Sequence, residues 1–198
     1  MTRLILASAS EARSRLLRAA GLTFERIPAH IDEQAVRESF QAAGTGPRAL
    51  ADSLAGLKAR KISVSHPDAI VIGADQLLVF DGEAIGKSAG LLEARTLLKR
   101  LAGTTHALVT ASVLAKNGAI VWRHVAHAEL TMRPLSDAFL DDYLLANGED
   151  LLGAVGCYRL EGKGIQLFSN ISGDYFTILG LPLLPLLGAL REFGVLLS

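Results

Sequence analysis

Two serines and an arginine stand where an apolar segment gives way to a helical one. Ser8 and Ser10 follow the apolar residues 4–7, and Arg13 lies one turn into a helix expected over residues 11–20. Free backbone amides at a helix start, two hydroxyls and a guanidinium would together bind an anion. A structural role is the commoner alternative for such a serine, because Ser10 is well suited to cap the helix.

A single carboxylate, Asp75, follows the apolar run of residues 69–74. Such a run is typical of a strand that is covered on both faces. We expect Asp75 to end this strand, which is where α/β proteins usually place ligands, and Gly73 leaves space beside it. Asp75 could hold a divalent cation or act as a general base. It could equally be a strand-terminating residue in a turn.

Three further charged residues could reach a ligand. Lys87 lies in Gly-Lys-Ser, which resembles the end of a P-loop, but position 81 is Asp where that motif needs Gly. Lys87 could bind phosphate from a loop or be an ordinary surface lysine. Glu33 could be a metal ligand or a solvated acid. Lys58 shares a helix face with leucines, so its stem should be packed while its ammonium could reach a cleft.

Other chemistries are disfavoured by composition and spacing. The 5 histidines show no HExxH spacing, no GxSxG motif is present, and Cys157 is the only cysteine. Zinc hydrolase, serine hydrolase and disulfide chemistry therefore have no support, and Cys157 is expected to be a buried small hydrophobe. Lys plus Arg and Asp plus Glu both number 20, so the formal charge is zero. This argues against nucleic-acid or membrane-surface partners but permits a phosphorylated small molecule.

The elements that must position these residues alternate between strands and helices. Asp81-Gly82 and Asn117-Gly118 predict two hairpin turns. Strands are expected near residues 4–7, 23–28, 69–74, 76–80, 107–115 and 119–132. Helices are expected near 11–20, 47–62, 91–101, 136–146 and from 182, and loop with bent strand over 153–164. This pattern predicts an α/β fold with a mixed twisted sheet flanked by helices, in one domain over residues 1–198 or two lobes around a cleft.

The two ends of the sequence bear on location. The apolar run at the start is too short for a signal peptide, and the apolar tail is interrupted by prolines and charges. With a single cysteine, these features lead us to expect a cytoplasmic protein.

The order of the motifs is more specific than any one of them. LILASAS, IDE at 31–33, LAGLKA at 54–59, IGADQ at 72–76, DGEAIGK at 81–87 and GDYFTILGLPL at 173–183 together resemble the Maf family. The resemblance covers nearly the whole chain. It implies a nucleoside triphosphate pyrophosphatase with an α/β fold related to inosine triphosphatases and a central cleft. It also implies a divalent metal, Mg²⁺ or Mn²⁺, and a possible homodimer.

The resemblance assigns roles to individual residues. Asp75 matches the family's catalytic acid, described as a proton acceptor, and it could also bind metal together with Glu33. The residues that match the family's triphosphate-binding cations and N-terminal loop serines are Arg13, Lys58, Lys87, Ser8 and Ser10.

The chain also departs from the family's usual residues. Its SxSPRR motif reads Ser10-Glu11-Ala12-Arg13 here, which puts a negative charge next to the proposed phosphate site. Gln76 and Glu161 match the branch that is similar to 7-methyl-GTP pyrophosphatases, whereas Ala12 stands where that branch has Trp. The alternatives are a dTTP/UTP pyrophosphatase and a nucleotide-binding regulator of cell division with little catalysis.

Overall fold

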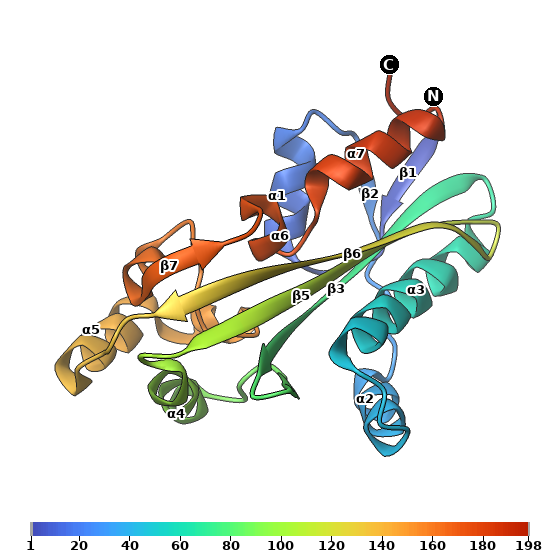
Figure 1. The fold of residues 1–198 in the computed structure, drawn as a ribbon. Coiled ribbons are helices and arrows are strands. Elements are labelled where there is room, and N and C mark those ends of the chain that lie inside the picture. The colour runs from blue at the N-terminus through green and yellow to red at the C-terminus, as the bar shows by residue number, and fades with distance from the viewer. Residues whose placement is uncertain (1, 198) are drawn as a thin grey trace. The chain divides into compact units, whose positions relative to one another are not determined.

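The computed structural model describes residues 2–197, which form two compact units. The first unit comprises residues 2–76, 109–126 and 174–197, and the second comprises residues 77–108 and 127–173. Over these residues a seven-stranded mixed sheet has the order β2-β1-β3-β5-β6-β7, with β4 paired to β3. Helices accompany the sheet in both units (Figure 1). The expected α/β fold with a mixed sheet flanked by helices is confirmed.

The strands are β1 (Arg3–Leu6), β2 (Glu25–Arg26), β3 (Ala69–Phe80), β4 (Glu83–Ile85), β5 (Thr105–Lys116), β6 (Ala119–Met132) and β7 (Phe168–Ser172). The α-helices are α1 (Glu11–Ala19), α2 (Glu33–Ala42), α3 (Pro47–Ser65), α4 (Leu91–Leu101), α5 (Asp137–Asn147), α6 (Tyr175–Ile178) and α7 (Leu183–Glu192). Two 3₁₀ helices span Gly148–Gly153 and Lys163–Leu167. None of the described helices combines the length and apolar character needed to cross a membrane.

In the first unit, helices cover both faces of the parallel strands β1 and β3. Leu4 and Leu6 of β1 join a cluster with α1 and α7, while Ile5 joins a second cluster with Ile62 of α3. Figure 1 shows α1 and α7 together on one side of these strands and α3 on the other. Burial on both faces explains why the paired segments 4–6 of β1 and 69–72 of β3 are continuous apolar runs rather than alternating ones.

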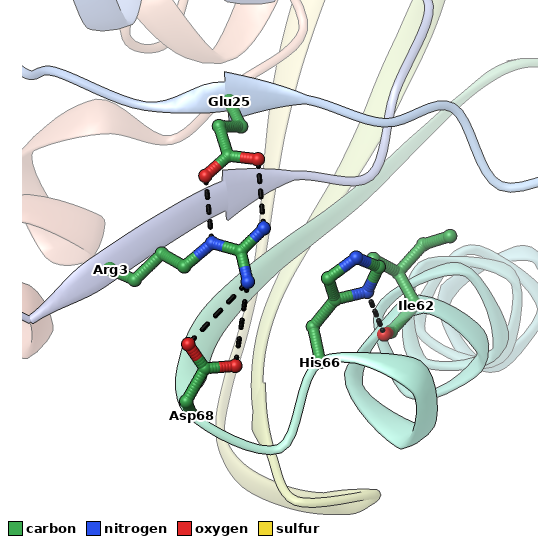
Figure 2. A network of polar contacts seen from close by, with 5 residues as sticks. All are labelled: Arg3, Glu25, Ile62, His66 and Asp68. Atoms are coloured by element: carbon green, nitrogen blue, oxygen red, sulfur yellow. Dashed lines mark hydrogen bonds and ion pairs between the residues drawn. The ribbon is translucent and has the colours of Figure 1, made fainter.

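An exposed arginine links the ends of the three parallel strands. Arg3 of β1 donates to both carboxylate oxygens of Glu25 on β2, at 2.7 and 2.9 Å, and contacts Asp68, which directly precedes β3, at 3.4 Å (Figure 2). Beside it, the Nδ1 atom of His66 is 3.0 Å from the carbonyl oxygen of Ile62. Exposed ion pairs add little stability. Their contribution here is to favour one register of β1 between its two neighbours.

In the second unit, the described strand pairs are antiparallel. Asp81 and Gly82 have φ values of 50° and 79°, which is the geometry of a two-residue hairpin turn between β3 and β4. Glu129 of β6 pairs with Ser172 of β7 in an antiparallel ladder. Helix α4 contacts α5 and the 3₁₀ helix Gly148–Gly153. The hairpin predicted at Asn117-Gly118, in the first unit, is also confirmed.

Several expectations about the elements were wrong. Asp75 does not end a strand, because the two segments expected on either side of it form one strand, β3, whose parallel pairing with β1 stops at Ile72 and whose last three residues pair with β4. The strand expected over residues 23–28 is reduced to Glu25–Arg26. Residues 153–164 contain no strand; turns and parts of the two 3₁₀ helices occupy them. Helices α2 and α6 and strand β7 were not predicted at all.

Candidate active site

The end of the parallel pairing between β1 and β3 places Ser8 and Asp75 in the same region of the first unit. Leu6 is the last β1 residue paired with β3, opposite Ile72, and the amide of Ala7 still donates to the Ile72 carbonyl at 2.8 Å. Ser8 follows at once, and Asp75 lies three residues beyond Ile72. The carboxyl ends of parallel strands are where open α/β sheets place ligands.

Lys58 of α3 joins two carboxylates. Its Nζ donates to Asp75 Oδ1 at 2.5 Å and contacts Glu33 Oε1 at 2.8 Å. The side chains of Lys58 and Asp75 are only 10% and 6% exposed, whereas that of Glu33 is 44% exposed. A buried ion pair depends on having both partners, since either charge alone would be poorly solvated. The structure therefore brings Asp75, Lys58 and Glu33 together, and Lys58 is buried as its packed stem suggested.

Gly73 explains how α3 comes close enough for this contact. A Cβ atom at position 73 would lie 2.2 Å from the carbonyl oxygen of Ala55 and 2.8 Å from the Cβ of Ala59. Ala55 and Ala59 flank Lys58 on the same helix and are fully buried. Three small residues thus let the helix backbone pack directly on β3, which brings Lys58 within reach of Asp75 two residues further along the strand.

The second oxygen of Asp75 has no protein partner within the described part of the chain. Asp75 Oδ2 is buried and accepts no hydrogen bond. Leaving a buried acceptor unsatisfied costs about 1–3 kcal/mol. Groups of this kind are rare in folded proteins, and a bound water, ion or substrate is a common explanation. Asp75 Oδ2 is therefore the atom of this site that most needs a ligand.

Ser8 and Gly180 hold the guanidinium of Arg13. Arg13 Nη1 donates to Ser8 Oγ at 3.1 Å, and Arg13 Nε donates to the carbonyl oxygen of Gly180 at 2.7 Å. Burial lowers the pKa of Arg13 from its ordinary value, while the charges of Asp75 and Glu33 raise it. Arg13 thus shares an electrostatic environment with both carboxylates. It remains a cation, because an arginine does not lose its proton in proteins.

Ser10 has the structural role considered above. Its side chain accepts from the amide of Arg13 at 3.4 Å and caps α1. Glu11 is the first residue of α1. Its Oε2 lies 2.6 Å from Arg26 Nη1, and its Oε1 lies 3.1 Å from Arg18 Nη1. Hydrogen bonds from Arg26 and Arg18 lower the pKa of Glu11. Its charge is therefore compensated by these two arginines.

Gln76 has its amide nitrogen committed to the protein. Nε2 lies 2.9 Å from Thr110 Oγ1, 3.0 Å from the carbonyl oxygen of Thr177 and 3.1 Å from that of Ile178. Carbonyl oxygens only accept hydrogen bonds, so the nitrogen of the amide must face them. The donor side of Gln76 is thereby used, and its Oε1 accepts no hydrogen bond from the described residues. Toward a ligand, Gln76 can therefore offer only the acceptor Oε1.

The remaining candidates lie in different places. Ala12 is a partly exposed residue of α1, adjacent to Arg13. Lys87 and Glu161 are exposed residues of the second unit, in the segment after β4 and in the turn before the 3₁₀ helix Lys163–Leu167. The phosphate-binding role that the resemblance implies for Lys87 stays a prediction.

The chain matches a protein-family model described as "Maf-like protein" over residues 3–193. It belongs to the Maf family. A relative from Granulibacter bethesdensis, named nucleoside triphosphate pyrophosphatase, is 53% identical over 98% of both chains. A relative from Rhizobium etli, named 7-methyl-GTP pyrophosphatase, is 50% identical, again over 98% of both chains.

One solved structure that this Maf family member resembles is only loosely similar to it. A nucleoside-triphosphatase, dITP/XTP pyrophosphatase, from Mycobacterium abscessus is 14% identical and has a TM-score of 0.45, covering 97% of this chain and 94% of its own. A TM-score of this size supports no inference about function.

The carboxylates of this Maf protein suit one mode of metal binding. Among residues 2–197 no three His, Cys, Asp or Glu side chains gather closely enough to enclose an ion. Mg²⁺ commonly binds through one or two carboxylates together with substrate phosphates rather than in a full protein cage. Asp75, with its unpartnered Oδ2, and Glu33 supply two such carboxylates, so the donor set fits a hard divalent cation that is shared with a phosphate.

Two features of the site escaped sequence reasoning. Helix α2 was not predicted, although Asp32 accepts from the amide of Ala35 at 3.0 Å and is a good helix cap. The cap followed by Glu33 was the available signal. The contact of Gly180 with Arg13 had no local signal, because its partner is 167 residues away in sequence.

Proposed function

We propose that this protein is a nucleoside triphosphate pyrophosphatase, which hydrolyses its substrate to a nucleoside monophosphate and pyrophosphate. The names of relatives at about half identity support this activity. The observation that carries the proposal is the buried, unpartnered Asp75 Oδ2 beside Lys58. A carboxylate oxygen kept from solvent and from protein donors is suited to receive a proton from an attacking water.

The site residues of the first unit have distinct proposed roles. Asp75 takes the proton of the water that attacks the α-phosphorus. Lys58 fixes the orientation of Asp75 through Oδ1, which leaves Oδ2 for the water. Arg13, held by Ser8, neutralises part of the negative charge of the triphosphate. Such preorganised cations stabilise the transition state of phosphoryl chemistry because they need no reorientation as charge develops.

Two further contributions complete the proposed chemistry. Lys87 of the second unit is proposed to bind phosphate, in agreement with its motif position. Asp75 and Glu33 are the residues proposed to hold a divalent cation, Mg²⁺ or Mn²⁺, and in that case Asp75 Oδ2 would be a metal ligand in place of the proton acceptor. When bound, such a cation would neutralise phosphate charge and polarise the phosphoryl oxygens.

For the base, we propose a guanine-type purine, with 7-methyl-GTP as the leading candidate. Guanine presents adjacent N1–H and N2–H donors, and a carboxylate such as Glu161 can accept both. Gln76 offers only an acceptor, because its nitrogen faces Thr177 and Ile178. A carboxylate acceptor suits a base edge with adjacent donors and disfavours the carbonyls of uracil and thymine. Ala12 provides no stacking surface, so the preference is expected to be moderate.

The test is release of pyrophosphate from a panel of triphosphates that contains 7-methyl-GTP, GTP, UTP and dTTP. Wild-type protein with Mg²⁺ or Mn²⁺ should turn over at least one of them, with kcat/KM highest for the guanine-type pair. Asp75→Asn should lower kcat by about 10²–10⁴-fold, the usual value of a general base. Circular dichroism and urea unfolding of Asp75→Asn would show whether the fold is retained.

Each outcome distinguishes between functions. No turnover of any triphosphate, with retained nucleotide binding, would favour a regulatory nucleotide-binding protein. A tenfold advantage for UTP or dTTP would support a pyrimidine pyrophosphatase and refute the base assignment alone. Glu161→Gln is the matched variant for the base, because it removes charge at constant shape. It should reduce the preference for GTP over UTP, and an unchanged ranking would exclude Glu161 from base selection.

A further inference from the structure

In the second unit, a partly buried side-chain contact joins the segment of Lys87 to the segment of Glu161. Ser88 follows Lys87 directly, and Cys157 lies four residues before Glu161. The Cys157 thiol donates to Ser88 Oγ at 3.2 Å. Neither segment is a regular helix or strand at these positions. A side-chain contact between them is therefore a means of fixing one against the other.

The backbone at Cys157 is held firmly in an uncommon conformation. Its φ is 55°, in the left-handed region that non-glycine residues seldom adopt, and the residue is fully buried. The hydroxyl of Tyr143, on α5, donates to the Cys157 carbonyl oxygen at 3.2 Å. Such conformations persist where the surroundings determine them fully, and they concentrate near functional sites.

The next residue anchors the same segment to β5. Tyr158 Oη lies 2.7 Å from His106 Nε2, and both side chains are buried. The Tyr158 ring also packs edge-on against Phe168, with ring centroids 4.9 Å apart. Residues 157 and 158 are thus fixed to α5 and β5, while the thiol remains directed at Ser88.

The protonation state of the thiol agrees with its role as a donor. Burial raises the pKa of Cys157 above its ordinary value, and hydrogen bonds with the side chain and backbone of Ser88 offset this only in part. A neutral thiol is a weak hydrogen-bond donor, whereas a thiolate is not a donor.

We propose that Cys157 is a positioning residue, which holds Ser88 and so sets the placement of Lys87 relative to the segment that carries Glu161. The proposal rests on the phosphate-binding role proposed for Lys87. Cys157 itself touches no substrate and has no part in the chemical step. Loss of the Cys157 contact should weaken binding of the triphosphate, because Lys87 attracts phosphate by its charge and must be correctly placed to do so.

The experiment is a double-mutant cycle on Cys157→Ala and Ser88→Ala, measured with the best triphosphate from the panel. Each single variant should raise KM about 3–10-fold, the size expected for one lost hydrogen bond, with kcat changed less than twofold. The double variant should be no worse than either single one, because both remove the same contact. Cys157→Ser should restore most of the wild-type KM, since a hydroxyl can also donate.

Ser136→Ala is the matched control, because it removes one hydrogen bond in the same unit, the cap that accepts from the amide of Phe139 at 3.2 Å. It should leave KM unchanged. Additive effects of the two variants, or an unchanged KM in Cys157→Ala, would overturn the proposal while wild-type turnover still supports the enzyme function. Hydrogen exchange provides a readout that needs no activity. The amides of residues 86–90 should exchange faster in Cys157→Ala, and an unchanged rate would refute the anchoring even if no triphosphate is hydrolysed.

Discussion

Replacing Lys58 with methionine should destabilise the protein more than any surface substitution. Lys58→Met keeps the length of the side chain and removes the ammonium that contacts Asp75 Oδ1 at 2.5 Å and Glu33 Oε1 at 2.8 Å. Glu33 is 44% exposed, so water can solvate it after the change. Asp75 is 6% exposed and its Oδ2 already lacks a partner, so the variant would leave a buried carboxylate with neither oxygen satisfied.

The size of the destabilisation follows from the isolation of the Asp75 carboxylate in this variant. Removing one partner of a buried ion pair costs about 3–5 kcal/mol. For a chain of this size each kcal/mol lowers Tm by about 2–4 °C, so Tm should fall by about 6–20 °C. The free energy of unfolding is measured by urea titration followed by circular dichroism. Pyrophosphate release by Lys58→Met should also fall, because Asp75 loses the contact that orients it.

Two companion variants test the reasoning. Lys116→Met removes an exposed lysine of the first unit and should change stability by less than about 0.5 kcal/mol. Adding Asp75→Asn to Lys58→Met should recover at least about 1 kcal/mol, because an amide replaces the unpaired charge. If Lys58→Met lies within about 1 kcal/mol of the wild type, the buried pair is not the organising contact of the site.

Two further predictions concern packing and pH. Gly73→Ala should cost at least about 1–3 kcal/mol by overpacking and should lower activity, since its Cβ would meet the Ala55 carbonyl oxygen at 2.2 Å. Gly56 lies on α3 with open space around it, so Gly56→Ala should instead raise the free energy of unfolding by up to about 1 kcal/mol in the same urea titration. Equal effects of Gly73→Ala and Gly56→Ala would refute the close-packing argument. Burial lowers the pKa of His106 to about 4. Because the unfolded chain takes up that proton first, near pH 6.5, stability should fall by about 3 kcal/mol as pH drops from about 6.5 to about 4. Unfolding of His106→Asn across that range should show a shallower decline, whereas the exposed His127→Asn should follow the wild type.

Local sequence signals predicted many elements well. Helices α1, α3, α4, α5 and α7 and the two hairpin turns occur where caps, prolines, glycines and periodicity indicated them. These signals act over a few residues, so the chain's own order contains them. The failures arose where longer-range pairing decided the outcome. Asp75 lies within β3 and does not end a strand, because β3 has partner strands along its length, and β7 forms as a partner of β6.

The sequence by itself determined the chemical groups of the site and the family, because these depend only on residue types and their order. Only the tertiary structure decided what those groups can do. Lys58 meets Asp75 because three small residues let α3 pack directly on β3. Gln76 can offer a ligand only its acceptor oxygen, because its amide nitrogen donates to carbonyl groups about a hundred residues later in the chain. Such contacts depend on helix-to-sheet distances and on packing between remote segments, and no local periodicity encodes either.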